Sequence, residues 1–173
     1  WQPGGATSGA FFTNNAANYT VTATDGNGCS GSSQILITPC EITLQLQAYL
    51  QGYYTGSSLM ANTLANQGIG NSATLCDSIV VELHQSSSPF LLAQSYTGVI
   101  STNGQLSCLF PGGVEGGMYY IVLKHRNSVE TWSSNPILIQ SNTSYYFHTD
   151  ASQAYGSNQI QAEPSIFALF SGD

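Results

Sequence analysis

Short runs of residues with a period of two recur along this chain of 173 residues. Between residues 42 and 50, Ile, Leu and Ala alternate with Thr and Gln, which predicts a strand with one face in a core and the other in water. Comparable runs predict strands at residues 19–24, 34–38, 78–84, 91–100, 105–110, 118–126, 136–140, 144–149 and 165–170. Only residues 59–67 have the composition of a short helix. Many short strands with turn-rich loops predict an all-β sandwich.

A strong turn and a proline divide the chain into two parts. The sequence Asp25-Gly-Asn-Gly28 lies between two strand-like runs, and the second run ends at Pro39. This pattern predicts a hairpin that closes one domain. A new half-buried strand follows Cys40, so we expect one domain over residues 1–40 and a second over residues 41–173.

The charge of the chain excludes one class of partner. Lys124 and Arg126 are the only two cations, against nine carboxylates, and the net charge is −7. Nucleic-acid binding needs many cations to release counterions from phosphates, so no nucleic-acid partner is expected. The chain has no apolar run of 18 residues, which predicts no membrane insertion.

The composition also indicates a location. Charged residues make up only 6% of the chain, and Ser, Thr, Asn, Gln and 18 Gly keep the surface polar. This composition is typical of secreted β-proteins and predicts an extracellular or cell-surface location. The N-terminus lacks the basic and apolar regions of a signal peptide, so we expect a piece of a longer protein that begins before Trp1.

The cysteines are Cys29, Cys40, Cys76 and Cys108. They form no CxxC pair, which disfavours zinc and leaves disulfides or buried thiols. Three pairings are possible, and pairing the first with the second and the third with the fourth respects the two domains. Alternatively, Cys108 is a small apolar residue on the face that it shares with Leu106 and Phe110.

The two cations suggest a structural ion pair. Arg126 and Glu130 are placed to form a salt bridge across a bend at residues 127–128, with Trp132 packed on the guanidinium. The alternative is a polar clamp, formed by Lys124, Arg126 and Glu130, beside an aromatic platform. Lys124 is also the only donor for an internal isopeptide bond.

No motif indicates catalysis. The three histidines, His84, His125 and His148, lie on separate predicted strands without metal-ligand spacing. His125 shares a strand face with Ile121, which favours a buried, hydrogen-bonded side chain. Glu82 and His84 share a face but lack a nucleophile, and the chain has neither a GxSxG elbow nor a cysteine nucleophile motif. We therefore expect a protein that is not an enzyme.

Two kinds of ligand remain open. Sugars stack on exposed aromatic rings, and four aromatic residues near predicted loops are candidates for this role: Tyr53, Tyr54, Trp132 and Tyr155. The alternative places them in the core. No cofactor is expected, although two sets of candidate calcium ligands exist: Asp25, Asn27 and backbone oxygens in the turn, or Asp173. A tight turn explains Asp25 and Asn27 without a metal.

Three stretches resemble known domains. Trp1, Asn18-Tyr-Thr-Val-Thr-Ala-Thr-Asp-Gly-Asn-Gly-Cys29 and Ile35-Leu-Ile-Thr38 resemble the closing half of the immunoglobulin-like PKD and SprB repeats of Bacteroidota adhesins. Ser78-Ile-Val-Val-Glu-Leu83, Thr102-Asn-Gly-Gln-Leu-Ser-Cys-Leu-Phe-Pro-Gly112 and Gly117-Met-Tyr-Tyr-Ile-Val-Leu123 resemble a transthyretin-like or Cna-B-like sandwich. These resemblances imply an Ig-like half-repeat followed by an antiparallel transthyretin/Ig-like β-sandwich.

The third resemblance covers residues 42–173. Leu75-Cys-Asp-Ser-Ile79, Lys124-His-Arg-Asn-Ser-Val-Glu-Thr-Trp132, Ala154-Tyr-Gly156 and Ser171-Gly-Asp173 resemble a C-terminal β-domain of secreted Bacteroidota proteins. In such proteins Gly172-Asp173 opens a dockerin-like calcium segment, and a type IX sorting domain follows. The resemblance implies a noncatalytic module displayed on the cell surface.

Together these observations predict a noncatalytic extracellular structural or adhesion module of a larger protein, whose partners are the neighbouring domains of the parent chain. One alternative is a carbohydrate-binding module that recognises surface glycans. Another is a filament subunit that self-associates, because an incomplete Ig-like half leaves strand edges that a second chain can complete.

Overall fold

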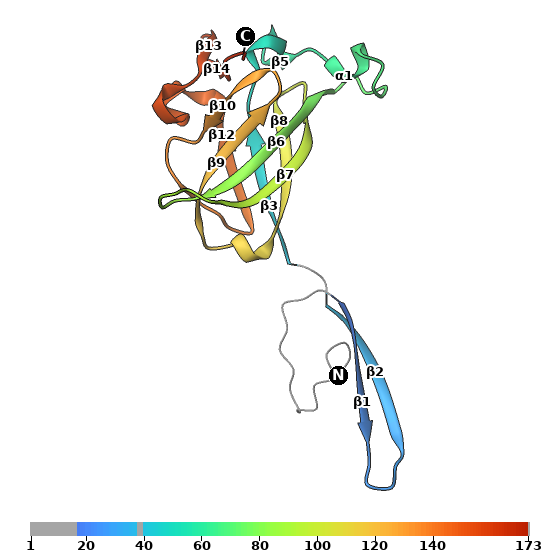
Figure 1. Ribbon diagram of the computed structural model, residues 1–173. Coiled ribbons are helices and arrows are strands. Elements are labelled where there is room, and N and C mark those ends of the chain that lie inside the picture. Colours follow the sequence, from blue (N-terminus) through green and yellow to red (C-terminus); the bar gives the residue numbers. More distant parts are fainter. Residues whose placement is uncertain (1–16, 38–39, 173) are drawn as a thin grey trace. The chain divides into compact units, whose positions relative to one another are not determined.

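A computed structural model describes residues 17–37 and 40–172 (Figure 1). The chain divides into two compact units, Trp1–Cys40 and Glu41–Asp173. The predicted all-β class is confirmed, because in the described part of the chain the one α-helix, α1 (Thr63–Asn66), has four residues. It lies inside the segment where the sequence allowed a short helix.

The described part of the first unit is a β-hairpin. β1 (Ala17–Thr24) pairs antiparallel with β2 (Ser30–Ile37). In the turn, the Asp25 carboxylate accepts hydrogen bonds from the backbone N–H groups of Asn27 and Cys29, both at 2.9 Å. Gly28 has a φ of 87°, a conformation that favours glycine. The turn therefore accounts for Asp25, while Trp1 and the rest of residues 1–16 lie outside the described residues.

The second unit contains a large antiparallel sheet with the order β10-β9-β6-β7, in which β11 also pairs with β9. Its strands are β6 (Leu75–Gln85), β7 (Leu92–Ser101), β9 (Met118–His125), β10 (Ser128–Trp132) and β11 (Ile137–Leu138). The strand predicted at residues 118–126 is β9. The chain reverses after His125, and Ser128 pairs with His125, so β9 and β10 form a hairpin.

A smaller sheet has the order β12-β3-β8. Its strands are β3 (Glu41–Gln47), β8 (Gln105–Pro111) and β12 (Asn142–Tyr146). The predicted antiparallel sandwich is confirmed with one exception among the described strands: β3 and β8 are antiparallel, whereas β12 runs parallel to β3. A hairpin forces neighbouring strands to be antiparallel, whereas β12 reaches β3 only after the chain has crossed from β11 in the large sheet.

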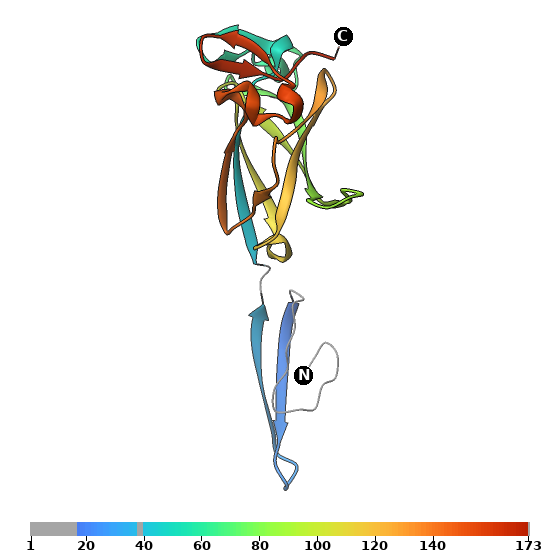
Figure 2. The ribbon, with the colours of Figure 1, turned by 90° about the vertical axis from the view of Figure 1, so that its left-hand side faces the viewer.

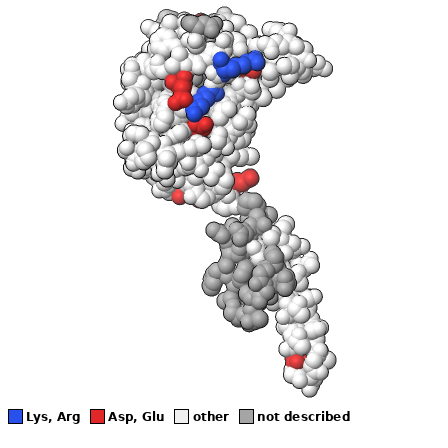
Figure 3. Space-filling model, viewed as in Figure 1, with Lys and Arg blue, Asp and Glu red and all other residues white. Residues whose placement is uncertain are grey.

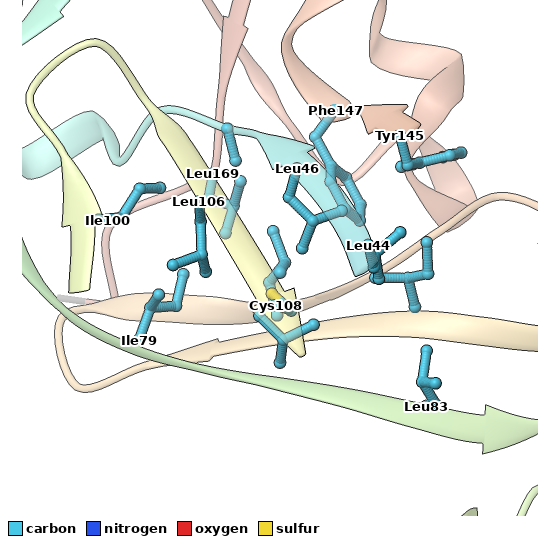
Figure 4. Close-up of a cluster of buried hydrophobic side chains, with 14 of the residues drawn as sticks. Leu44, Leu46, Ile79, Leu83, Ile100, Leu106, Cys108, Tyr145, Phe147 and Leu169 are labelled. Carbon is cyan, nitrogen blue, oxygen red and sulfur yellow. The ribbon is translucent and has the colours of Figure 1, made fainter. Parts of the chain in front are cut away.

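The core lies between the two sheets, and period-two alternation supplies its side chains (Figure 4). Fully or almost fully buried residues come from both sheets: Ile42, Leu44 and Leu46 from β3, Leu106, Cys108 and Phe110 from β8, Ile79, Val81 and Leu83 from β6, and Ile121 and Leu123 from β9. Each Leu or Ile side chain removed from water contributes roughly 1.5–3 kcal/mol to folding. The polar residues between them point to the opposite face of each strand, so they do not reduce this contribution.

Short elements gather at one end of the sandwich (Figures 1 and 2). They are η1 (Gln51–Tyr53), β4 (Tyr54–Gly56), β5 (Leu59–Met60), η3 (Phe147–Thr149), η4 (Ala151–Gln153), η5 (Tyr155–Ser157), β13 (Ile160–Glu163) and β14 (Ile166–Ala168). A further 3-10 turn, η2 (Gly112–Val114), follows β8. The segment from η4 to η5 is tied to the large sheet, because Ser134 N donates to Gln153 O at 2.8 Å and Ser133 forms a bridge with Ala154.

All four cysteines are free, so neither predicted disulfide forms. Cys29 and Cys40 lie beyond opposite ends of β2, whose eight residues span roughly 25 Å, far more than a disulfide allows. Cys76 and Cys108 are buried on β6 and β8 of opposite sheets. Cys108 is the small apolar core residue of the alternative interpretation, and burial raises its pKa to about 12.

Candidate functional site

The outer face of the large sheet carries the polar and aromatic residues of β9 and its neighbours. Tyr120, Val122 and Lys124 alternate with the core residues of β9, so they point away from the core. The register places His84 of β6 beside Tyr120, and Trp132 of β10 beside Val122. Val122 is fully buried even though it lies on this outer face. Its neighbours therefore form a packed surface layer.

This layer contains a pocket of about 380 Å³, lined by Phe90, Tyr120, Trp132 and Tyr155. Three chain regions supply these rings: Tyr120 and Trp132 come from the β9–β10 hairpin, Phe90 from the turn between β6 and β7, and Tyr155 from η5. The volume lies in the range of small-molecule sites, which are lined mainly by apolar and aromatic side chains.

The walls of the pocket are steeply inclined to one another. The Phe90 ring lies at 81° to Tyr120 and at 82° to Trp132, with ring centroids 5.8 and 6.4 Å apart. Tyr120 and Trp132 are inclined at 58°, with centroids 5.7 Å apart. Tyr155 is 68% exposed. The first three rings therefore form a corner, and the coplanar platform on which a flat sugar would stack is not formed among them.

Polar contacts hold Trp132 in place. Its indole Nε1 donates a hydrogen bond of 2.7 Å to Glu130 Oε1, and the other carboxylate oxygen of Glu130 lies 3.5 Å from Lys124 Nζ. The Trp132 ring also packs on His84, with centroids 4.8 Å apart. Asn158 Nδ2 donates to the backbone oxygen of Glu130 at 3.2 Å, which ties the residue after η5 to β10.

The same chain of contacts continues to Phe90. Lys124 Nζ lies 2.8 Å from Glu82 Oε2, and that oxygen also lies 2.8 Å from His84 Nε2. His84 Nδ1 lies 2.7 Å from the carbonyl oxygen of Phe90. A neutral imidazole has one N–H and donates to one of these two acceptors, whereas a protonated ring donates to both. A continuous series of five contacts therefore links the backbone of Phe90 to the indole of Trp132.

The charges of this series reinforce one another. Burial raises the pKa of Glu82, but hydrogen bonds from His84 and Lys124 and their charges outweigh it, so the pKa lies below its usual value. The hydrogen bond to Glu82 and the two nearby carboxylates raise the pKa of Lys124. Lys124 therefore remains a cation and Glu82 an anion at neutral pH.

A second polar cluster surrounds Asp77, which is 1% exposed on β6. Its Oδ2 accepts hydrogen bonds from Tyr53 Oη at 3.0 Å, His125 Nε2 at 3.2 Å and Arg126 Nη2 at 2.7 Å. Its Oδ1 accepts from the backbone N–H of Ser78 at 2.8 Å. Burial raises the pKa of Asp77, and these four hydrogen bonds together outweigh it and hold the pKa below its usual range.

His125 is buried and hydrogen-bonded, as the sequence predicted. Its Nδ1 accepts from the backbone N–H of Asn127 at 3.1 Å, so Nε2 carries the proton that is donated to Asp77. Burial lowers the pKa of His125, against the opposing effect of Asp77. Both ring nitrogens of His125 are therefore engaged within the protein.

The predicted Arg126–Glu130 salt bridge is wrong. Arg126 lies in the turn between β9 and β10 and reaches Asp77 on β6, whereas Glu130 meets Lys124 across the two strands. Trp132 packs on His84, Tyr120 and Phe90 instead of on the guanidinium. The reason is the hairpin, because strand pairing rather than a local bend decides which side chains meet. Figure 3 shows both cations on one face of this unit with acidic groups beside them.

The four predicted glycan-binding aromatics separate into two pairs. Trp132 and Tyr155 line the pocket. Tyr53 donates to Asp77, and Tyr54 donates to Glu163 Oε2 at 3.0 Å, and both rings pack against the core. They have the structural role of the alternative interpretation.

The sequence analysis missed two wall residues. Tyr120 shares its strand face with Val122 and Lys124, which was visible in the period-two pattern, although its outward position did not identify a pocket. Phe90 follows Pro89 in the β6–β7 turn, and a bulky apolar residue at a turn is an available signal of an exposed site.

No group of three or more His, Cys, Asp or Glu that could hold a metal occurs within residues 17–37 and 40–172. Asp173, the other calcium candidate, lies outside the described residues. Within the same ranges, no helix is long and apolar enough to cross a membrane.

The second unit is thus an all-β sandwich with an aromatic pocket on the outer face of its large sheet. Comparison with family models and with curated proteins gives no match. A crystal structure of S.CueP aligns with a TM-score of 0.34 and 10% sequence identity, over 76% of this chain and 78% of that one. At this level of similarity no property of that protein is transferred to the chain.

Proposed function

We propose that this chain is a noncatalytic structural and adhesion module of a larger extracellular or cell-surface protein, and that the aromatic pocket is its adhesive site. The observation that carries the proposal is the pocket itself. Four aromatic rings from three chain regions converge on one hollow, and ion pairs and hydrogen bonds connect two of its walls. Pre-organised walls of this kind lower the entropic cost of binding.

The state of the reactive groups supports a noncatalytic role. His84 and His125 use both ring nitrogens in contacts within the protein. Cys76 and Cys108 are buried, and desolvation raises the pKa of these thiols to about 11 and about 12. A thiol with such a pKa holds little of the thiolate that acts as a nucleophile at neutral pH.

The extracellular location rests on composition. Ser, Thr, Asn, Gln and Gly, rather than charged residues, keep the surface of this chain polar, and only 6% of residues are charged. In this proposal the partners of the module are the neighbouring domains of its parent chain and the surface to which the pocket binds. The net charge of −7 opposes binding to nucleic acid.

A second candidate function is carbohydrate binding. It is favoured by Trp132 and Tyr155, two aromatic residues that line the pocket, because aromatic rings stack on the C–H face of a sugar. Both candidates place the contact at the same rings.

Binding of the recombinant chain to arrayed glycans and to lipid-coated surfaces tests the proposal. Tyr155→Ala removes an exposed wall, and Tyr146→Ala is the matched control, because Tyr146 is also exposed, at 48%, but lies on β12 outside the pocket. We expect binding that Tyr155→Ala abolishes and Tyr146→Ala preserves, with the ligand recovered unchanged. Binding that both variants retain, or no binding to any surface, would rule out adhesion through the pocket.

A further inference from the structure

We propose that the aromatic pocket binds a trimethylammonium group, and that its source is the choline headgroup of a zwitterionic lipid surface. This inference rests on the proposed adhesive role of the pocket and names its ligand. Four independent features support it: the inclination of the rings, the hydrogen bonds already made beside them, the charge of the chain, and an exposed apolar turn.

The inclined rings form the walls of a cage. A cation is attracted to the face of an aromatic ring within about 6 Å of its centroid, and several faces turned toward one point act together. The Phe90 ring is nearly perpendicular to both Tyr120 and Trp132, with Tyr155 contributing a further ring to the same hollow. A compact cation can contact the faces of differently oriented rings, whereas a flat sugar ring stacks on one face or on parallel faces.

The strongest polar groups beside the pocket are already engaged. The indole N–H of Trp132 is donated to Glu130, and Lys124 is held between Glu130 and Glu82. A trimethylammonium group has no N–H to satisfy, so it loses no hydrogen bond when it enters the hollow. A primary ammonium group would bring three donors that need acceptors, at a cost for each donor left unpaired.

The hydrogen bond from Trp132 to the Glu130 carboxylate also favours a cation. Donation to an anion increases the electron density of the indole ring, which strengthens its attraction for a positive charge on its face. At longer range, the net charge of −7 attracts cations and repels anions. The only two cations of the chain are both neutralised, Lys124 by Glu82 and Glu130 and Arg126 by Asp77.

An exposed apolar turn indicates a lipid as the source. Phe90 and Leu91 end the turn between β6 and β7, Leu92 begins β7, and the three side chains are 41%, 56% and 53% exposed. The turn projects from the sandwich (Figure 2). Phe90 has a φ of 55°, which is uncommon for a bulky residue, and its ring forms one wall of the pocket. Exposure of these apolar side chains to water is unfavourable, whereas they are buried when they enter the boundary between lipid headgroups and acyl chains.

Sedimentation with lipid vesicles tests this proposal. The intact chain is mixed with vesicles of phosphatidylcholine and phosphatidylglycerol at 4:1, and separately with phosphatidylethanolamine and phosphatidylglycerol at 4:1, so that the two surfaces carry the same net charge. We expect binding to the first surface and at least tenfold weaker binding to the second. Free choline should compete, and 3,3-dimethyl-1-butanol, its neutral isostere, should not.

Variants separate the cage from the turn. Tyr155→Ala should weaken both vesicle binding and choline binding about three- to tenfold, the loss expected for one cation–π contact. Leu92→Ser should weaken vesicle binding alone, because Leu92 is outside the pocket lining. Tyr146→Ala should leave both unchanged. Circular dichroism establishes that each variant is folded.

The outcomes distinguish this inference from the function on which it rests. Equal binding to both vesicle types, or equal competition by choline and its isostere, overturns the trimethylammonium assignment. Choline binding without vesicle binding overturns the lipid source. If glycans bind through the pocket while vesicles and choline do not, the inference is wrong and adhesion stands. If Tyr155→Ala changes binding to none of these ligands, both proposals are wrong.

Discussion

Replacement of Asp77 by Asn tests the most deeply buried carboxylate among the described residues of the second unit. The carboxylate is 1% exposed and accepts four hydrogen bonds, one at Oδ1 from the Ser78 backbone and three at Oδ2. An asparagine side chain has one oxygen and one NH2 group in the same space. If its oxygen faces the three donors, the NH2 group faces the Ser78 N–H; if it is turned over, the NH2 group faces Tyr53, His125 and Arg126.

The expected loss of stability follows from the better of these orientations. One buried donor loses its acceptor, at a cost of about 1–3 kcal/mol, and the remaining hydrogen bonds weaken because their acceptor is no longer charged. Together these effects should lower the free energy of unfolding by about 2–4 kcal/mol, consistent with removing one partner of a buried ion pair.

Urea unfolding at pH 7, followed by circular dichroism, measures this loss. Asp150→Asn is the matched control, because the exposed Asp150 side chain caps η4 by accepting a hydrogen bond from Ser152 N at 2.8 Å and should change stability far less. Arg126→Gln should lower the free energy of unfolding less than Asp77→Asn does. Arg126 is exposed, and without it the Asp77 carboxylate still accepts three other hydrogen bonds. A change under about 1 kcal/mol for Asp77→Asn would refute the reasoning, because it is smaller than one unsatisfied buried group.

Three further predictions follow from buried groups and from one turn. Burial lowers the pKa of His125 and His148, and hydrogen bonds outweigh burial to lower that of Asp77, so the unfolded chain binds more protons than the folded chain between about pH 6.5 and the acid range. Stability should therefore fall as the pH drops through this window, and a rise in the urea midpoint from pH 7 to pH 5 would contradict the prediction. A thiol reagent should react rapidly with the exposed Cys29 and Cys40 and reach Cys76 and Cys108 only after unfolding, because the last two are buried with pKa values of about 11 and about 12; four rapid equivalents would argue against this core. Gly104→Ala should lower the free energy of unfolding by about 1–3 kcal/mol, because Gly104 has a φ of 80° and an added Cβ would lie 2.5 Å from the backbone oxygen of Ala48. Gly113→Ala is the control and should lower the free energy of unfolding far less, because the space around Gly113 is open. The melting temperatures of the two variants compare these effects.

The sequence was most informative where alternation is strongest. Residues 42–50 alternate apolar and polar side chains, and β3 buries Ile42, Leu44 and Leu46 as that pattern predicts. The burial of His125 also followed from its shared face with Ile121. Such predictions succeed because side chains alternate between the two faces of any strand, whatever its partners are.

Partners were less predictable than faces. The parallel pairing of β12 with β3 depends on where the chain crosses between the sheets, and this crossing leaves no local signal. The same holds for Arg126, which bonds Asp77, a residue 49 positions away, instead of Glu130, four positions away. Sequence proximity favoured the wrong acceptor, because the β9–β10 turn directs Arg126 toward β6.

The sequence by itself determined the fold class, the turn at Asp25, the outward face of Lys124 and the presence of aromatic residues near loops. Only the tertiary structure decided that Phe90, Tyr120, Trp132 and Tyr155 share one pocket while Tyr53 and Tyr54 pack on the core. The physical reason is that period-two alternation specifies a side for each residue of a strand, whereas register and loop packing specify which residues on that side meet. Register and loop packing depend on the whole set of core contacts rather than on any one segment.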